Sequence, residues 1–264
     1  MAKSEANVAR HAEQVWITGG GSGIGLATAQ LLAAQGSRVI ISGRDAKKLQ
    51  QACDESNRQL GSEALLALPC DLTDPGSRQQ AFTQLLDQHG LPDLLILNAG
   101  NHIPVRPDTL KLDDFEQLMA INYLAVIACL EALLPAMLAR GTGQIAVVAS
   151  VAGYRGLPTG AAYGASKAAL INTCEALYPE LKAKGIDLKL INPGFVKTPL
   201  TDKNRFAMPF LIDSQQAARA IVRGLDRTGF EIAFPRVFVT LLKLLRILPY
   251  RLFFALSRKL IPKD

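Results

Sequence analysis

The stretch that decides the fold runs from Gln14 to Gln35 and reads QVWITGGGSGIGLATAQLLAAQ. It opens with a short apolar run, Gln14–Thr18, which is typical of a buried strand. A glycine-rich turn follows, and residues 24–35 then have the Ala- and Leu-rich pattern of a helix that closes at Gly36. The stretch therefore predicts a strand, a tight turn and a helix in direct succession.

The same alternation of short apolar runs and longer helical patterns continues to Phe234. Strands joined by helices of this length pair in parallel through right-handed crossovers. The sequence therefore predicts an α/β fold, a single Rossmann-type doubly wound parallel sheet of about seven strands with helices on both faces. Further strands are expected at 38–42, 64–68, 93–97, 144–149, 187–191 and 231–234, and further helices at 45–60, 74–89, 113–140, 160–184 and 214–226.

Composition and charge exclude other classes. The chain has 264 residues, of which 49% are hydrophobic and 20% charged, so disorder is excluded as its main state. The net charge of +6 lies entirely in residues 236–264, which hold seven Lys or Arg and one acid. Because residues 1–235 are neutral overall, the pattern is not that of a nucleic-acid-binding protein, and no nucleic-acid partner is expected.

Cysteine and histidine usage indicates the compartment. The four cysteines are far apart and include no CxxC pair, and the three histidines are scattered, so neither a disulfide framework nor a metal site is expected. Residues 1–14 lack the apolar core of a signal peptide, and no stretch reaches 18 uninterrupted apolar residues. These features predict a cytoplasmic protein with reduced thiols.

The glycine-rich turn, residues 18–25, predicts a phosphate-binding loop. Glycines allow a tight turn and a close approach of the backbone to a ligand. The helix that follows presents free N–H groups and a partial positive charge, which suit a pyrophosphate. The alternative is a glycine-rich turn that binds nothing.

The end of the second predicted strand bears on the choice of dinucleotide. An acid here would accept hydrogen bonds from a ribose 2′-hydroxyl and select NAD. Instead Gly43 leaves room and Arg44 offers a guanidinium to a phosphate, which favours NADP(H), while Asp45 is placed to cap the next helix. The alternative is that the cofactor is NAD(H) and that Arg44 is a solvated surface residue.

Tyr163 and Lys167 form the second motif. Residues four apart on a helix share a face, so the lysine ammonium lies near the phenol and favours its ionised form. Moving the pKa of a tyrosine from about 10 to about 7 requires roughly 4 kcal/mol, which the ammonium and a positively charged nicotinamide would supply together. Ser150, at the end of the fifth predicted strand, is placed to hold a substrate oxygen; the alternative is a capping serine.

Together these motifs resemble those of the short-chain dehydrogenase/reductase family, over about residues 14–234. The resemblance implies that Tyr163 is the catalytic acid/base, that Lys167 lowers its pKa, and that Ser150 orients the substrate oxygen. It also implies that Asn122 holds a water in a proton relay. The positions that carry the resemblance are Thr18, Gly19, Gly23, Gly25, Asp71, Asn98, Ala99, Gly100, Asn122, Ser150, Tyr163, Lys167, Pro193, Gly194 and Thr198.

The resemblance also implies a set of cofactor-binding residues. Within it, Asp71 contacts the adenine ring, Lys167 the nicotinamide ribose, and the segment 193–198 the carboxamide. Two positions depart from the family's pattern. Leu97 stands where a second Asn is common, and Ser22 stands where NADP-preferring members often carry a basic residue. The whole set is Thr18, Gly19, Ser22, Gly23, Ile24, Gly25, Arg44, Asp71, Leu72, Asn98, Ala99, Gly100, Tyr163, Lys167, Pro193, Gly194, Val196 and Thr198.

The predicted function is that of an oxidoreductase that transfers a hydride between NADP(H) and a carbonyl/alcohol substrate, with no metal. A hydrophobic ketone, such as a keto-lipid or a steroid-like molecule, is the leading substrate class. Alternatives are an NAD-dependent alcohol dehydrogenase and a non-catalytic dinucleotide-sensing or scaffold protein. The family suggests a homodimer or homotetramer. Apolar residues of the expected substrate lid either contact the substrate or pack on the core; they are Phe206, Met208, Phe210 and Leu211.

Two further features concern the surroundings of the site. His102 and Arg106 follow the fourth predicted strand and are expected at the surface, with the mouth of the pocket as the alternative. Residues 236–264 are predicted to be a basic amphipathic helical extension, broken at Pro249, beyond a catalytic domain of residues 1–235. Its apolar face is predicted to contact an anionic membrane surface, a second subunit or the protein's own core.

Overall fold

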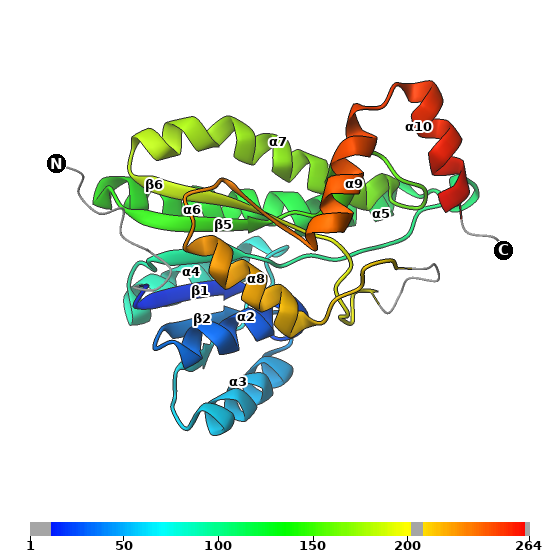
Figure 1. Cartoon of the computed structure of the whole chain (residues 1–264). Coiled ribbons are helices and arrows are strands. Elements are labelled where there is room, and N and C mark those ends of the chain that lie inside the picture. The colour runs from blue at the N-terminus through cyan, green and yellow to red at the C-terminus, as the bar shows by residue number, and fades with distance from the viewer. Residues whose placement is uncertain (1–11, 202–207, 262–264) are drawn as a thin grey trace.

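The computed structural model describes residues 12–201 and 208–261, which contain one seven-stranded parallel sheet (Figure 1). The spatial order of the strands is β3-β2-β1-β4-β5-β6-β7, and each neighbouring pair is parallel. The predicted doubly wound fold is therefore confirmed. The strands are β1 (Gln14–Thr18), β2 (Arg38–Ser42), β3 (Leu65–Ala67), β4 (Leu94–Leu97), β5 (Gly143–Val148), β6 (Ile186–Pro193) and β7 (Glu231–Phe234).

Helices cover both faces of the sheet. Successive residues of a strand point to opposite faces, so Trp16 packs with one helical layer and Ile17 with the other. The layer on Ile17 comprises α2 (Gly23–Ala34), α3 (Ala46–Leu60) and α8 (Ser214–Leu225). The other comprises α4 (Pro75–His89), α6 (Ala125–Arg140) and α7 (Ala161–Ala183). The described residues also contain α5 (Leu112–Met119), α9 (Arg236–Ile247) and α10 (Tyr250–Ser257).

The carboxyl edge of the sheet contains the point where the strand order reverses. The chain passes from β1 to β2 on one side of the sheet's centre, and from β4 to β5 on the other side. A crevice therefore opens between the ends of β1 and β4. The Thr18 hydroxyl oxygen accepts hydrogen bonds from the backbone N–H groups of Asn98 (3.0 Å) and Ala99 (3.1 Å). These bonds hold the turns after the two strands side by side.

One predicted helix is divided. The apolar pattern predicted a continuous helix at 113–140, but Ala120–Leu124 forms a π-helical turn between α5 and α6. By length and composition Leu112–Arg140 would suffice to span a membrane. Its residues Cys129, Leu133 and Met137 lie in the core cluster with Trp16, so one face of this segment packs on the sheet.

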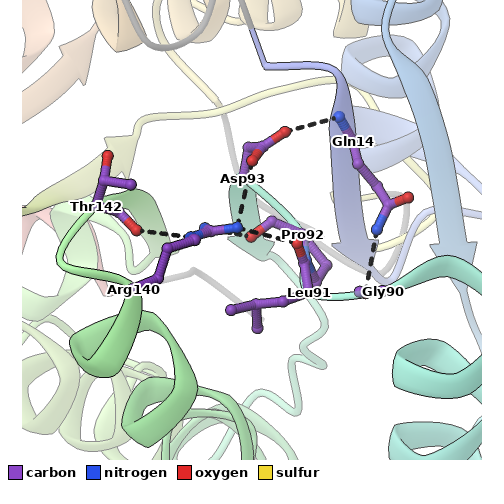
Figure 2. Close-up of polar contacts among 7 residues, drawn as sticks. All are labelled: Gln14, Gly90, Leu91, Pro92, Asp93, Arg140 and Thr142. Carbon is purple, nitrogen blue, oxygen red and sulfur yellow. Dashed lines mark hydrogen bonds and ion pairs between the residues drawn. The ribbon is translucent and has the colours of Figure 1, made fainter.

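The opposite, amino edge of the sheet is held by a polar cluster (Figure 2). Arg140, in the last turn of α6, donates hydrogen bonds to the carbonyl oxygens of Leu91 (3.1 Å), Pro92 (2.9 Å) and Thr142 (3.1 Å). Its guanidinium also pairs with Asp93 at 3.4 Å, and Asp93 accepts a bond from the Gln14 N–H at 3.1 Å. The cluster ties α6 to the beginnings of β1, β4 and β5.

The predicted C-terminal extension begins with a helix that packs on the protein's own core. Phe238, Val239 and Leu242 of α9 are buried in the core cluster that contains Trp16. In Figure 1, α9 rises from the end of β7 and α10 descends beside it at one end of the molecule. One face of α9 thus packs on the protein's own core, which was one of the three predicted contacts of the extension. The other faces of α9 do not take part in this packing.

Candidate active site

A cavity of about 110 Å³ lies at the carboxyl edge of the sheet. It brings together Ser150, Tyr163 and Lys167, which come from the end of β5 and from α7. From the predicted cofactor set it also gathers Ile24, Asn98, Gly100, Pro193, Gly194, Val196 and Thr198, and its remaining lining residues are Asn101, Val148, Ala149, Leu200 and Thr201.

Ser150 lies between the phenol and the end of β6. Its hydroxyl caps the short helix Val151–Gly153 by accepting from the Ala152 N–H at 3.1 Å, and it donates to the Pro193 carbonyl oxygen at 3.4 Å. A further hydrogen bond joins it to the Tyr163 side chain. Ser150 is therefore a capping serine and, at the same time, a partner of the phenol.

The phenol of Tyr163 is held in its protonated form by its surroundings. Burial raises its pKa above the usual 10, and the hydrogen bond with Ser150 opposes that rise. The Lys167 nitrogen lies 5.8 Å from the centre of the tyrosine ring. The side chains around Tyr163 therefore do not lower its pKa toward 7. The positive charge of a bound nicotinamide would have to lower it.

Lys167 is buried, with 3% of its surface exposed, and donates a hydrogen bond to the Val148 carbonyl oxygen at 2.8 Å. Burial lowers its pKa to about 8 because the charged form is poorly solvated there. The bond to β5 fixes the direction of the ammonium, which lies on the same cavity as the phenol.

Asn122 is fully buried in the π-helical turn, behind the cavity wall. Its side-chain oxygen accepts from the Asn101 N–H at 2.7 Å, and its amide donates to the Asn101 carbonyl (3.0 Å) and the Ser166 hydroxyl (2.9 Å). A Cβ on Gly100 would lie 3.0 Å from the Asn122 oxygen and 3.5 Å from the Lys167 nitrogen. Asn122 thus lies near Lys167, and the relay water remains a prediction.

The glycine-rich turn forms a cradle that larger residues would fill. Gly19 has φ +64°, and a Cβ on it would lie 2.8 Å from the Ala99 Cα. A Cβ on Gly25 would lie 2.3 Å from the Gly19 carbonyl oxygen. Ser22 precedes α2 but its side chain does not cap the helix, so the first-turn N–H groups of α2 remain available to a ligand. This backbone fits the pyrophosphate of a dinucleotide.

Arg44, Asp71 and Leu72 lie along the same edge, and like the glycines of the turn they do not line the cavity. Arg44 is exposed after β2, and its charge acts on Asp71. Burial tends to raise the pKa of Asp71, but hydrogen bonds from Thr73 and the charge of Arg44 outweigh it and lower that pKa. Leu72 is buried, and Asp45 caps α3 by accepting from the Lys48 N–H at 3.1 Å, as predicted.

The structure adds residues that the motifs did not indicate. The Val148 carbonyl holds Lys167, and the Ser166 hydroxyl holds Asn122. Val148 lies two residues before Ser150, and Ser166 directly precedes Lys167. His102 is half-buried, and its ring meets that of Tyr163 edge-on at 4.8 Å between centres. The expectation of a surface role for His102 was therefore wrong, because the loop after β4 folds over α7.

The predicted lid is described in part. Phe206 lies outside the described residues. Phe210 has φ +59° and its ring lies 5.9 Å from that of Phe238 in α9, so it packs against the C-terminal helices. Phe210 and Leu211 remain about half exposed.

A second, larger cavity of about 590 Å³ lies beside the first turn of α7. Arg106 lines it, and Arg106 pairs with Asp108 at 3.8 Å. The cavity adjoins a small apolar cluster in which Val105 and Ala162 pack with Tyr163. Its other lining residues are mostly apolar: Pro107, Leu110, Leu157, Pro158, Thr159, Ala161 and Ile261.

Sequence comparisons agree with this geometry. Residues 13–208 match the family model of the short chain dehydrogenases. An uncharacterized oxidoreductase of Myxococcus xanthus is 34% identical over 244 residues, which cover 92% of this chain and 96% of the relative. The chain belongs to the short-chain dehydrogenase/reductase family and is an oxidoreductase.

Solved structures share the fold and differ in their nucleotide. A short-chain dehydrogenase from Sphingobium yanoikuyae in complex with NADPH is 24% identical, with a TM-score of 0.77 over 90% of this chain and 96% of that one. One from Burkholderia phymatum in complex with NAD is 23% identical, with a TM-score of 0.79 over 88% and 92%. At these identities the likeness shows the fold alone.

Proposed function

We propose that this oxidoreductase transfers a hydride between NADP(H) and a carbonyl/alcohol pair, with a hydrophobic ketone as its preferred substrate. The observation that carries the proposal is the convergence of Ser150, Tyr163 and Lys167 on one cavity at the strand-order reversal. A phenol, an amine and an alcohol at one apolar-walled site suit proton transfer to a carbonyl oxygen.

The glycine cradle supports a dinucleotide at this edge. The first turn of α2 would hold the pyrophosphate, and Asp71 the adenine. Arg44, exposed after β2, would bind a 2′-phosphate, and this supports NADP(H) over NAD(H). The bound nicotinamide would supply or accept the hydride.

The side chains of the chain would handle the proton. Tyr163, protonated at neutral pH because burial raises its pKa, would donate its proton to the substrate oxygen during reduction. Ser150 would orient that oxygen through its hydroxyl. Lys167, fixed by the Val148 carbonyl, would stabilise the phenolate that remains, and Asn122 would position the water through which the proton is replaced.

The preference for an apolar substrate is supported by the second cavity. Most of its lining is apolar, and it adjoins the packing cluster of Tyr163. A keto-lipid or steroid-like molecule would place its reactive carbon at Tyr163 and its apolar part in this volume.

The test is a panel of ketones assayed with NADPH and with NADH. We expect turnover with NADPH, highest for apolar ketones, and a loss of at least about 100-fold in kcat for Tyr163→Phe. A loss below about tenfold would overturn the acid/base role. Equal or better turnover with NADH would favour the NAD-dependent alcohol dehydrogenase, and dinucleotide binding without turnover the sensing or scaffold protein.

Cytoplasmic localisation and a homodimer or homotetramer remain predictions from the sequence. Native mass measurement of the full chain would determine the number of subunits. The same measurement identifies any small molecule that copurifies.

A further inference from the structure

Exposed apolar side chains are concentrated at one place in the described residues. Of sixteen large hydrophobic residues that are exposed, ten lie between Val237 and Ile261. Monomeric soluble proteins rarely leave such a group uncovered unless it contacts a partner or a membrane. The C-terminal helix pair, defined here as residues 236–261, is therefore the strongest candidate for an interaction surface.

Helix α9 has two separate apolar stripes. Phe238, Val239 and Leu242 form the buried stripe that packs on the core. Val237, Leu241 and Leu244 follow the helical spacing of i, i+4 and i+7, and are 61%, 48% and 54% exposed. Because the buried stripe already attaches α9 to the sheet, the second stripe is not needed for that packing.

Helix α10 continues the surface beyond the bend at Pro249. It buries Phe253 and Ser257, whereas Leu252 and Leu256, one turn apart, are exposed. The rings of Tyr250 and Phe254 stack on its surface at 5.5 Å and are also exposed.

Arg155 holds the bend between the two helices in place. Its guanidinium donates to the carbonyl oxygens of Leu245 (2.7 Å), Arg246 (2.9 Å) and Leu248 (2.7 Å). It also lies 3.9 Å from the centre of the Phe253 ring. The exposed apolar residues are thus presented by an ordered support and not by a loosely attached tail.

The charge of this surface indicates its partner. Residues 236–261 contain six Lys or Arg and no acid, whereas residues 1–235 are neutral. One of the six, Lys243, pairs with Glu231 of β7, which leaves a net positive charge on the helix pair. A symmetric dimer through this surface would bring the same cations face to face, which is repulsive. An anionic lipid surface instead attracts the cations and takes up the apolar side chains.

We propose that the C-terminal helix pair docks on the surface of an anionic lipid bilayer, with the exposed stripes of α9 and α10 in its interfacial region. Ile261, from this helix pair, and Leu110 both line the second cavity and are both exposed. If the proposed function holds, docking would bring the mouth of that cavity to the lipid from which an apolar ketone enters.

The experiment is vesicle co-sedimentation of the full chain. Vesicles of phosphatidylcholine and phosphatidylglycerol in equal parts are compared with vesicles of phosphatidylcholine alone, at about 50 and about 500 mM NaCl. We expect binding to the anionic vesicles that weakens at least severalfold in high salt. Absence of binding to anionic vesicles at low salt overturns the proposal, whatever the enzymatic activity.

Variants locate the surface. We expect the double variant Leu241→Glu, Leu244→Glu to lose at least tenfold in vesicle binding, with unchanged melting temperature and NADPH binding. Leu86→Glu, on an exposed apolar residue of α4, is the matched control and retains binding. Arg251→Gln with Arg258→Gln would weaken binding without altering the apolar stripes.

The alternative occupant is a second copy of this chain. In that case light scattering would show the wild type as a dimer and the Leu241→Glu, Leu244→Glu variant as a monomer. Neither the wild type nor the variant would sediment with vesicles. That result overturns the proposal in favour of a subunit interface. Retention of vesicle binding by the double variant also overturns it, because the exposed stripes would then not be the lipid contact.

Discussion

The side-chain nitrogen of Lys167 donates a 2.8 Å hydrogen bond to the carbonyl oxygen of Val148, two residues before Ser150. This bond joins the helix that carries the phenol to the last residue of β5, two positions before the serine. The pKa of Lys167, lowered by burial to about 8 from 10.5, makes its charge sensitive to pH in an accessible range.

We predict that this lysine makes the folded protein less stable at neutral pH than at pH 10. Between about 8 and 10.5 the unfolded chain binds a proton that the folded chain does not, so stability rises with pH by roughly 3 kcal/mol at most. The free energy of unfolding of the wild type and of Lys167→Met is measured in urea from pH 7 to 10. The difference between the two proteins at each pH gives the contribution of Lys167. A constant difference across this range would contradict the prediction.

Arg44 is predicted to discriminate between dinucleotides. Removing its guanidinium in Arg44→Ala loses a charge-assisted bond to the 2′-phosphate, and we expect the Kd for NADPH to rise about tenfold or more while that for NADH changes little. Isothermal titration measures both. An unchanged Kd for NADPH would show that Arg44 does not contact the phosphate, and Lys47→Ala on the exposed start of α3 serves as the control for general charge.

Glu231 connects β7 to α9. Burial tends to raise its pKa, but hydrogen bonds from Lys243, Tyr154 and Asn192 lower it overall. Stability from this group is therefore present above the usual pKa of 4.5 and is lost as pH falls through the lower folded value. We expect Glu231→Gln to be destabilised at pH 7 and to unfold in acid with a shallower pH dependence, measured by circular dichroism against exposed Glu131→Gln.

Arg155 is predicted to order the C-terminal helices. In Arg155→Met three carbonyl oxygens at the end of α9 lose their donor, so hydrogen exchange in residues 245–257 is expected to accelerate at least tenfold. Arg155→Lys restores the charge but not the planar donor set, and rescues only in part. Exchange at wild-type rates in Arg155→Met would show that the bend is held by packing alone.

Arg140 is predicted to contribute to stability and not to turnover. Arg140→Met removes the donor for three carbonyl oxygens and the partner of Asp93, and we expect a loss of roughly 2 kcal/mol in the free energy of unfolding. Because the cluster lies at the amino edge, kcat at low temperature stays within about twofold of the wild type. A large fall in kcat with unchanged stability would contradict this separation.

The sequence predicted the sheet well because its strands are buried on both faces. Runs such as Leu94–Leu97 are continuously apolar, and glycines or prolines mark their ends, so each strand could be found from local pattern alone. The π-helical turn at Ala120–Leu124 could not be found in this way, because it inserts a residue into the helix without interrupting the apolar pattern.

The site was predictable where it is encoded in short motifs. Tyr163 and Lys167 are four residues apart, and Ser150 ends a recognisable strand. The contacts that depend on distant segments were not predictable: His102 reaches Tyr163 across 61 positions only because the loop after β4 folds over α7. For the same reason Arg155 gave no signal in the sequence, since its partners lie 90 to 93 residues further along the chain.

The larger cavity has its walls in two connecting segments, in the first residue of α7 and in Ile261, and none in a strand of the sheet. Connecting segments tolerate insertions and replacements far better than the strands they join. Paralogues descended from a common ancestor can therefore diverge in what they accept by drift in those segments alone, while the hydride-transfer apparatus is inherited intact.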